Sequence, residues 1–173
     1  MTSSKQLGKL RDFSTQLAER LRAAPQREAE PLRLAVRMGS NHYLVDMANA
    51  SEIVALPETT RVPWTQPWYR GLANVRGRLV GVVDLLQLAV GASTPADPSL
   101  HLLVLNESLH AHAGLLVTRA FGLRNIAQLE QLEPAANAPP WEGSRYRDVD
   151  GTVMTELNLG RLVASEAFAA IGL

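Results

Sequence analysis

Residues 74–88 read Asn-Val-Arg-Gly-Arg-Leu-Val-Gly-Val-Val-Asp-Leu-Leu-Gln-Leu, and residues 148–162 read Asp-Val-Asp-Gly-Thr-Val-Met-Thr-Glu-Leu-Asn-Leu-Gly-Arg-Leu. At an offset of 74, Gly77 matches Gly151, and Asp84 matches Asn158 just before a run of leucines. Glycine is suited to tight turns, and Asp and Asn both cap helix N-termini. Each stretch therefore predicts a hairpin turn, a strand and a capped helix, which indicates an internal repeat.

The repeat extends upstream of these two stretches. Leu44-Val45 matches Leu116-Val117 at an offset of 72, and Ile53 and Leu56 match Ile126 and Leu129 at 73. Small loop insertions would produce this drift. We therefore predict a mainly β fold of two small β-barrels packed together, because closure of each barrel hides its strand edges. The proline-containing segment 94–99 is the predicted boundary, with subdomain one at about 31–95 and subdomain two at about 99–158.

The remaining elements follow from hydrophobic periodicity. Alternation of apolar and polar residues predicts strands at 32–38, 42–45, 53–56, 75–83 (as a hairpin), 100–105, 115–118, 123–126, 146–149 and 152–157. Proline-rich loops are expected at 57–71 and 134–143. A short mid-chain helix is expected at 85–90, with Asp84 as N-cap and Gly91 at its end, and a C-terminal helix at 159–171.

Residues 1–30 form an N-terminal helical extension in this interpretation, ahead of a domain at 31–173. Apolar side chains recur at spacings of three and four (Leu7, Leu10, Phe13, Leu17 and Leu21), Ser3 with Gln6 fits a capping box, and Pro25 ends the helix. Such a helix can cover its own domain or dock on a partner protein. The sequence leaves both open.

Composition excludes several function classes. The 173 residues carry a formal net charge of zero and no cysteine, so disulfides, thiolate metal sites and a cysteine nucleophile are excluded. A neutral chain argues against broad nucleic-acid binding. The most apolar stretch, residues 79–92, is interrupted by Asp84 and Gln87 and is too short to span a bilayer. With no apolar signal segment at its N-terminus, the protein is expected to be cytoplasmic, without membrane insertion.

No constellation of catalytic residues is evident. His110 and His112 would share one face of a strand, but no third metal ligand lies nearby, and we interpret them as exposed loop residues. A nucleophile elbow and a phosphate-binding glycine loop are both missing. Asp148 and Asp150 flank a turn and are expected to initiate it. We predict a protein with no catalytic site, metal or cofactor, and a hydrolase that uses His110 or His112 is a remote alternative.

A basic and aromatic segment stands out instead. Residues 59–83 contain four arginines and no acid, and Arg, Trp and Tyr are the residues that most often anchor protein interfaces. Candidate anchors are Arg61, Trp64, Trp68, Arg70 and Arg78. The alternative is that the tryptophans close the barrel ends and the arginines are only solvated. For Arg76, which lies at a hairpin between Asn74 and Gly77, we favour a role in recognition.

The ordered motifs of this segment resemble the CheW family of chemotaxis coupling proteins. They are Glu52-Ile-Val-Ala-Leu-Pro57, Arg61-Val-Pro63, Trp68-Tyr-Arg-Gly71, Asn74-Val-Arg-Gly77 and Val82-Val-Asp-Leu85, within a similarity over about residues 32–170. Three short segments, Arg61-Val-Pro63, Gln66-Pro-Trp68 and Gly71-Leu-Ala-Asn-Val-Arg-Gly-Arg78, are most similar to the PilI-type adaptors of type IV pilus (twitching motility) systems.

The resemblance implies two SH3-like five-stranded β-barrels and a non-enzymatic adaptor without cofactors. Such adaptors join the cytoplasmic tip of a chemoreceptor to the regulatory domain of a CheA-type histidine kinase, at membrane-associated receptor arrays. The resemblance places receptor binding at Arg76, in the groove between the barrels, with Gly71, Asn74 and Gly77 shaping the loop and Glu52 on the adjacent strand.

Four departures from the family pattern are visible: Val75 replaces Leu, Pro67 is shifted by one residue, Gly81 replaces Pro, and Thr118 replaces an Asp. A coupling protein of a flagellar or other chemosensory pathway is the alternative within the same class. A small-barrel nucleic-acid-binding protein that uses the arginine and tryptophan residues is the alternative from another class.

Overall fold

The structure, a computed structural model, describes residues 32–173. The chain divides into two units, Met1–Glu30 and Pro31–Leu173. The helix predicted at 3–23 lies outside the described residues. The elements of the second unit are β1 (Leu32–Met38), β2 (Asn41–Val45), β3 (Ala50–Ala55), β4 (Thr59–Thr60), β5 (Tyr69–Val75), β6 (Arg78–Val83), α2 (Leu85–Val90), β7 (His101–Leu105), β8 (Ala113–Val117), β9 (Arg119–Asn125), β10 (Glu130–Leu132), β11 (Glu142–Arg147), β12 (Val153–Leu157), α3 (Leu159–Val163) and α4 (Glu166–Ala169).

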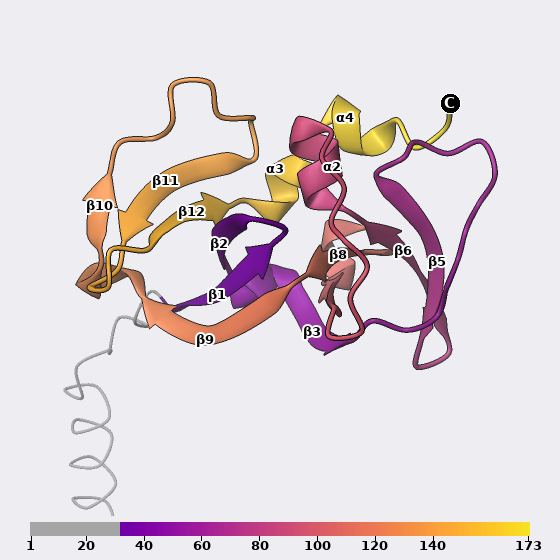
Figure 1. Ribbon diagram of the computed structural model, residues 1–173, viewed down its shortest axis with the longest axis horizontal. Helices are drawn as coiled ribbons and strands as arrows, with labels where there is room; N and C mark the ends of the chain where they lie inside the picture. Colours follow the sequence, from indigo (N-terminus) through magenta and orange to yellow (C-terminus); the bar gives the residue numbers. More distant parts are fainter. Residues whose placement is uncertain (1–31) are drawn as a thin grey trace, which may run out of the picture. The chain divides into compact units, whose positions relative to one another are not determined.

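The strands form two six-stranded sheets (Figure 1). Sheet A has the order β10-β11-β12-β2-β1-β9, and sheet B has the order β3-β7-β8-β6-β5-β4. The mainly β class is therefore confirmed. Each sheet has six strands where five were expected, and the additional members, β4 and β10, are only two and three residues long.

The internal repeat is visible in the strand order. When sheet A is written from β9 to β10, its strands correspond one for one to those of sheet B, with β1–β2 matching β7–β8 and β12 matching β6. The match includes direction, because β2 pairs parallel with β12 and β8 pairs parallel with β6, whereas all other pairs among the described strands are antiparallel. The two halves of the sequence thus encode the same arrangement twice.

The predicted division into consecutive subdomains at 31–95 and 99–158 is wrong in one respect, because the two halves exchange their first hairpins. β1–β2 lies in sheet A between β9 and β12, and β7–β8 lies in sheet B between β3 and β6. The chain length between strands explains the exchange. Only Thr118 separates β8 from β9. One residue reaches about 7 Å, less than the roughly 9.6 Å of two strand spacings that β9 would have to cross to flank β7.

The central strands are buried on both faces. In β2, Tyr43 and Val45 join a core cluster that both sheets share, whereas Leu44 points into a second cluster within sheet A. β8 has the same pattern, with Leu116 pointing into a cluster within sheet B. The shared core is covered by apolar residues of the helices, namely Leu85, Leu159, Leu162 and Phe168. Since these helices and both sheets bury one cluster, the sheets pack as a unit.

Several element boundaries differ from the prediction. Asp84 and Gly91 cap α2 as expected, but the helix predicted at 159–171 is split into α3 and α4. Ser165 has extended backbone, and its hydroxyl accepts a hydrogen bond from the Phe168 amide, so it starts a new helix. β5 begins at Tyr69, inside the predicted 57–71 loop, because its residues pair with β6. The short strand β10 was not predicted.

We expect residues 31–97 to remain unfolded when expressed alone. This fragment lacks β9 and β12, so the hairpin β1–β2 has no flanking strand on either side, and two apolar faces are exposed. Narrow dispersion of amide shifts in a ¹H–¹⁵N NMR spectrum would show this. A cooperative thermal transition of the fragment alone would contradict the exchanged arrangement.

Candidate functional site

The hairpin turn between β5 and β6 holds Arg76 in an unusual conformation. Arg76 has φ 51° and Gly77 has φ 85°, so both central residues of this two-residue turn lie in the left-handed region, as in a type I′ turn. Asn74 stabilises the turn by accepting a hydrogen bond from the Gly77 amide at 2.8 Å. A positive φ at a non-glycine residue is strained, and such strain concentrates at functional positions. The turn presents the Arg76 side chain, which is 77% exposed.

Glu52 lies beside Arg76, although not on an adjacent strand as the resemblance implies, because β7, β8 and β6 separate β3 from β5 in the sheet. It belongs to β3, at an irregularity in the pairing with β7. Its Oε2 atom is 2.9 Å from Nη2 of Arg76, and its side chain is the more buried of the two. An exposed ion pair adds at most about 1 kcal/mol to stability. Its main effect is to orient the guanidinium, which has five N–H donors and keeps most of them available to a partner.

Gly71 lies on β5, five residues before Arg76, and allows β4 to approach β5 closely. Its φ is 130°, and a Cβ atom there would lie 2.1 Å from the carbonyl oxygen of Thr60. β4 therefore approaches β5 this closely only because residue 71 has no side chain. Gly77 differs, since nothing lies within 4 Å of a Cβ atom at that position. Gly71 is required for packing and Gly77 for backbone conformation.

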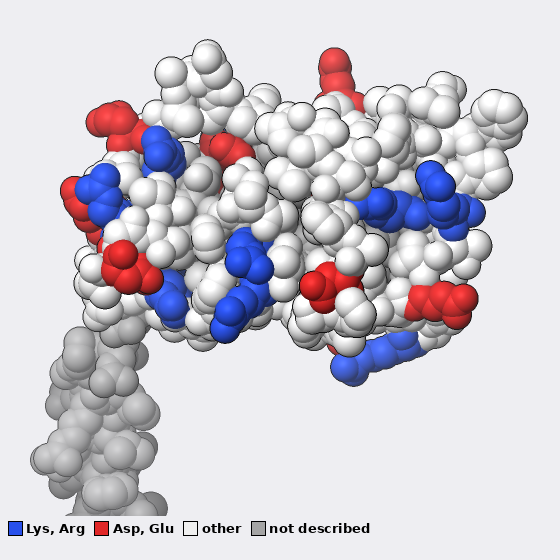
Figure 2. All heavy atoms as spheres, in the orientation of Figure 1, with Lys and Arg blue, Asp and Glu red and all other residues white. Residues whose placement is uncertain are grey.

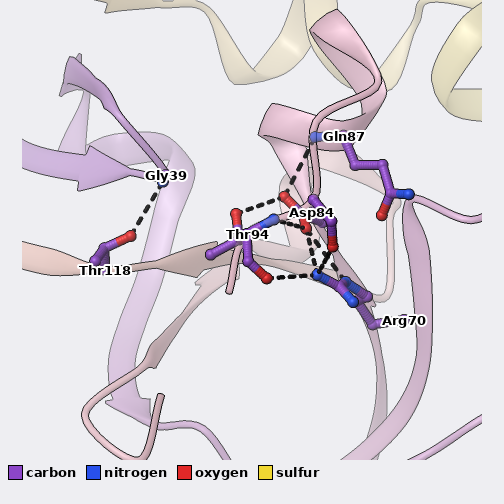
Figure 3. Close-up of polar contacts among 7 residues, drawn as sticks. Gly39, Arg70, Asp84, Gln87, Thr94 and Thr118 are labelled. Atoms are coloured by element: carbon purple, nitrogen blue, oxygen red, sulfur yellow. Dashed lines mark hydrogen bonds and ion pairs between the residues drawn. The ribbon is translucent and has the colours of Figure 1, made fainter. Parts of the chain in front are cut away.

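Arg70 points inward and clasps Asp84 (Figure 3). Its Nη2 atom donates to Oδ2 of Asp84 at 2.7 Å and to the carbonyl of Thr94 at 2.8 Å. Asp84 has no exposed surface, and it also accepts hydrogen bonds from the amide and the hydroxyl of Thr94, both at 2.8 Å. These contacts favour a structural role for Arg70, which ties β5, α2 and the segment after α2 together, over the predicted role as an interface anchor.

The two candidate tryptophans have opposite environments. Trp68 is 7% exposed, and its ring stacks on Phe168 with the centroids 6.1 Å apart, so it belongs to the core that both sheets share. Trp64 is 83% exposed and has φ 59°. Of the two, only Trp64 is accessible to a partner.

The other candidate anchors lie in separate places. Arg78 forms an exposed ion pair with Glu107. Arg61 is exposed and lines a pocket together with Arg70 and Tyr69, and partial burial raises the pKa of Tyr69. The structure therefore brings Arg76 and Glu52 together at one place and Arg61 and Arg70 at another.

Two of the departures from the family pattern have local explanations. The hydroxyl of Thr118 accepts a hydrogen bond from the Gly39 amide at 3.0 Å, so this side chain fastens the β1–β2 turn of sheet A to the end of β8 (Figure 3). A Cβ atom at Gly81 would lie 2.8 Å from the Tyr69 hydroxyl, and the Gly81 amide donates to the carbonyl of His112 at 2.8 Å. A proline at position 81 would lose this donor.

A groove with a volume of about 360 Å³ lies between the sheets. It is lined by the β1–β2 turn at Gly39 and Ser40, by Leu86 of α2 and by residues around Pro95 and Leu100. No residue of the 74–78 hairpin lines it. That one receptor segment contacts both this groove and Arg76 stays a prediction.

The two histidines that the sequence singled out lie in one loop. His110 and His112 are exposed in the connection between β7 and β8, as expected. Among residues 32–173, no cluster of three His, Asp or Glu side chains could hold a metal ion. Within that same range, no helix has the length and apolar character needed to cross a bilayer.

We expect Gly71→Ala to destabilise the protein by more than about 2 kcal/mol, because the new methyl group would meet the Thr60 carbonyl in a strained backbone. Gly77→Ala is the matched control, since it adds the strain of positive φ but no clash, and about 1 kcal/mol is expected. Urea unfolding measures both values. Equal losses for the two variants would show that the close approach of β4 is unimportant.

We expect Arg70→Ala to lower the free energy of unfolding by about 3 kcal/mol, because it leaves the buried Asp84 carboxylate without its cation. Arg78→Ala removes an exposed ion pair instead and should change stability by less than about 1 kcal/mol. Thermal and urea unfolding of the two variants provide the comparison. Similar effects would mean that Asp84 is satisfied by Thr94 and the helix cap alone.

Comparisons with known proteins agree with the motif pattern and the fold. The model of the CheW-like domain matches residues 33–167. The chain is 32% identical over 120 residues to the protein PilI of Pseudomonas aeruginosa. This alignment covers 66% of this chain and 67% of PilI. It is 24% identical over 144 residues to the chemotaxis protein CheW of Klebsiella aerogenes, covering 80% of this chain and 84% of the relative.

A solved structure supports the fold independently. The crystal structure of the scaffolding protein TtCheW from Thermoanaerobacter tengcongensis superposes with a TM-score of 0.68 at 16% identity, covering 83% of this chain and 94% of TtCheW. The match of 33–167 spans most of the described residues and contains the Arg76 hairpin, Glu52 and the Arg70–Asp84 clasp. The chain therefore belongs to the CheW-like family of non-enzymatic scaffold and adaptor proteins.

Proposed function

We propose that this protein couples a chemoreceptor to a CheA-type histidine kinase in a chemosensory pathway that controls type IV pilus-based motility. The observation that carries the pilus assignment is the 32% identity to PilI over two thirds of both chains. The alternative, a flagellar or other chemosensory pathway, rests on the 24% identity to CheW, which is lower than the identity to PilI. The protein would act in the cytoplasm, at receptor arrays, with each sheet corresponding to one SH3-like barrel of the family.

The receptor contact is proposed at the β5–β6 hairpin. The turn holds Arg76 away from the sheet, Glu52 orients its guanidinium, and Gly71, Asn74 and Gly77 maintain the shape of the hairpin. A receptor hairpin would offer an amphipathic helix to this surface. Arg76 would then donate hydrogen bonds to carboxylate or carbonyl oxygens along that helix, because a planar guanidinium can bind two acceptors at once.

Pairing of the arginines argues against the nucleic-acid alternative. Of the four arginines in the acid-free segment 59–83, three form ion pairs with acids from elsewhere in the chain: Arg70 with Asp84, Arg76 with Glu52, and Arg78 with Glu107. Nucleic-acid binding depends on unneutralised Lys and Arg that displace counterions from phosphates. The folded chain therefore has far less free positive charge here than the sequence of the segment indicates.

We expect Arg76→Glu to abolish receptor binding while the protein stays folded. The reversed charge would meet Glu52 and the receptor acceptors with repulsion, and a well-exposed side chain contributes little to stability. Co-sedimentation with membranes that carry a pilus-pathway chemoreceptor and its CheA-type kinase measures ternary complex formation. The wild type should enter the pellet, and the variant should remain in the supernatant.

Arg119→Glu is the matched control, since Arg119 is exposed on β9 of sheet A and forms no ion pair among residues 32–173. It should co-sediment as the wild type does. An Arg76→Glu protein that loses more than a few degrees of melting temperature would show a structural role for the arginine. A folded wild type that joins no complex with receptor and kinase would refute the coupling function.

A further inference from the structure

A second cavity opens on sheet B, separate from the Arg76 hairpin. It has a volume of about 330 Å³, within the range of ligand-binding pockets. Val82, Leu100 and Leu116 form its apolar floor, and Val82 and Leu116 belong to the cluster that fills the interior of the sheet. The cavity thus extends from the surface to the apolar cluster that packs within sheet B. No residue of the turn at 74–78 lines it.

The charged residues that line this cavity are both basic, although the exposed Glu58 directly precedes the lining residue Thr59. Two arginines and no acidic residue line it, and Figure 2 shows basic side chains over the upper part of β5. Arg70 is neutralised by the buried Asp84. Arg61 is exposed, and none of the ion pairs among residues 32–173 includes it. The cavity mouth therefore has one available cation above an apolar floor.

An open strand edge lies beside the cavity. β4, which is two residues long, is the last strand of sheet B, and one of its edges pairs with no strand among residues 32–173. Thr59 of this strand and the adjacent Arg61 both line the cavity. Extended peptides bind such edges by backbone hydrogen bonds and place alternate side chains in nearby pockets. An unpaired edge, a free cation and an apolar hollow together form the elements of a peptide-binding site.

We propose that this cavity binds an extended acidic segment of a partner protein, which pairs with β4, places a carboxylate on Arg61 and inserts a bulky apolar side chain onto Val82 and Leu116. The site is independent of the receptor contact at Arg76. An adaptor that carries it can hold a further protein while the hairpin is occupied.

The test uses the full chain and the peptide Ser-Glu-Leu-Glu-Phe-Ser-amide, which carries fluorescein on its N-terminal amine. Binding should be seen as increased fluorescence anisotropy, and amide shifts in ¹H–¹⁵N NMR spectra should change at Thr59, Arg61 and Leu100. Arg61→Glu should weaken binding at least about fivefold, because attraction becomes repulsion at an exposed position. Ala96→Trp should also weaken it, because Ala96 lines the cavity and the indole would occupy the hollow.

Arg76→Glu and Arg119→Glu should bind the peptide as the wild type does, which separates this site from the receptor contact. A peptide with Lys in place of Glu, and one with Ser in place of Leu and Phe, should bind at least about fivefold more weakly. The proposal is overturned if the acidic peptide changes no amide shift around the cavity at millimolar concentration. It is also overturned if Arg61→Glu binds the acidic peptide as well as the wild type.

Discussion

The fold depends on neutralising one carboxylate that has no contact with solvent. Asp84 ends β6 and starts α2, so its charge is placed where strand, helix and the following loop meet. An isolated buried carboxylate would be strongly unfavourable. Arg70 supplies the opposite charge from β5, and Thr94 supplies two hydrogen bonds from the loop after α2. Satisfying this charge therefore fixes three segments at once, including the strand that leads to the Arg76 hairpin.

The ion pair between Arg70 and Asp84 also gives Arg70 a different role from the nearby Arg76. Arg70 and Arg76 are six positions apart on one strand and its turn, yet the first is directed to the interior and the second to the surface. Trp64 and Trp68 differ in the same way. In both pairs the surface member has a positive φ, whereas the interior member lies in or beside the paired part of β5. Backbone conformation at the turns thus makes Trp64 and Arg76 accessible to a partner.

Local signals in the sequence predicted most elements and the candidate site. The α2 caps, the strands of regular alternation and the Arg76–Gly77 turn depend on neighbouring residues. The resemblance named Glu52 but placed it on an adjacent strand, whereas β3 lies at the opposite edge of sheet B. Long-range choices could not be predicted. The hairpins β1–β2 and β7–β8 have the same pattern, so only the three-dimensional structure shows which half each joins. Thr94 has no sequence signal for its contact with Arg70, 24 positions away, and the break at Ser165 lies in an otherwise helical pattern.

The exchanged hairpins have a consequence during biosynthesis. On the ribosome, β1 and β2 emerge before the other strands, but their flanking strands β9 and β12 are encoded about 80 and 110 residues later. Sheet B is completed once β8 has emerged, whereas sheet A is completed only when β12 has emerged. The two earliest strands, which bury apolar side chains on both faces, must therefore avoid aggregation until β9 and β12 have been made, and the last strand, β12, completes sheet A by pairing with β2.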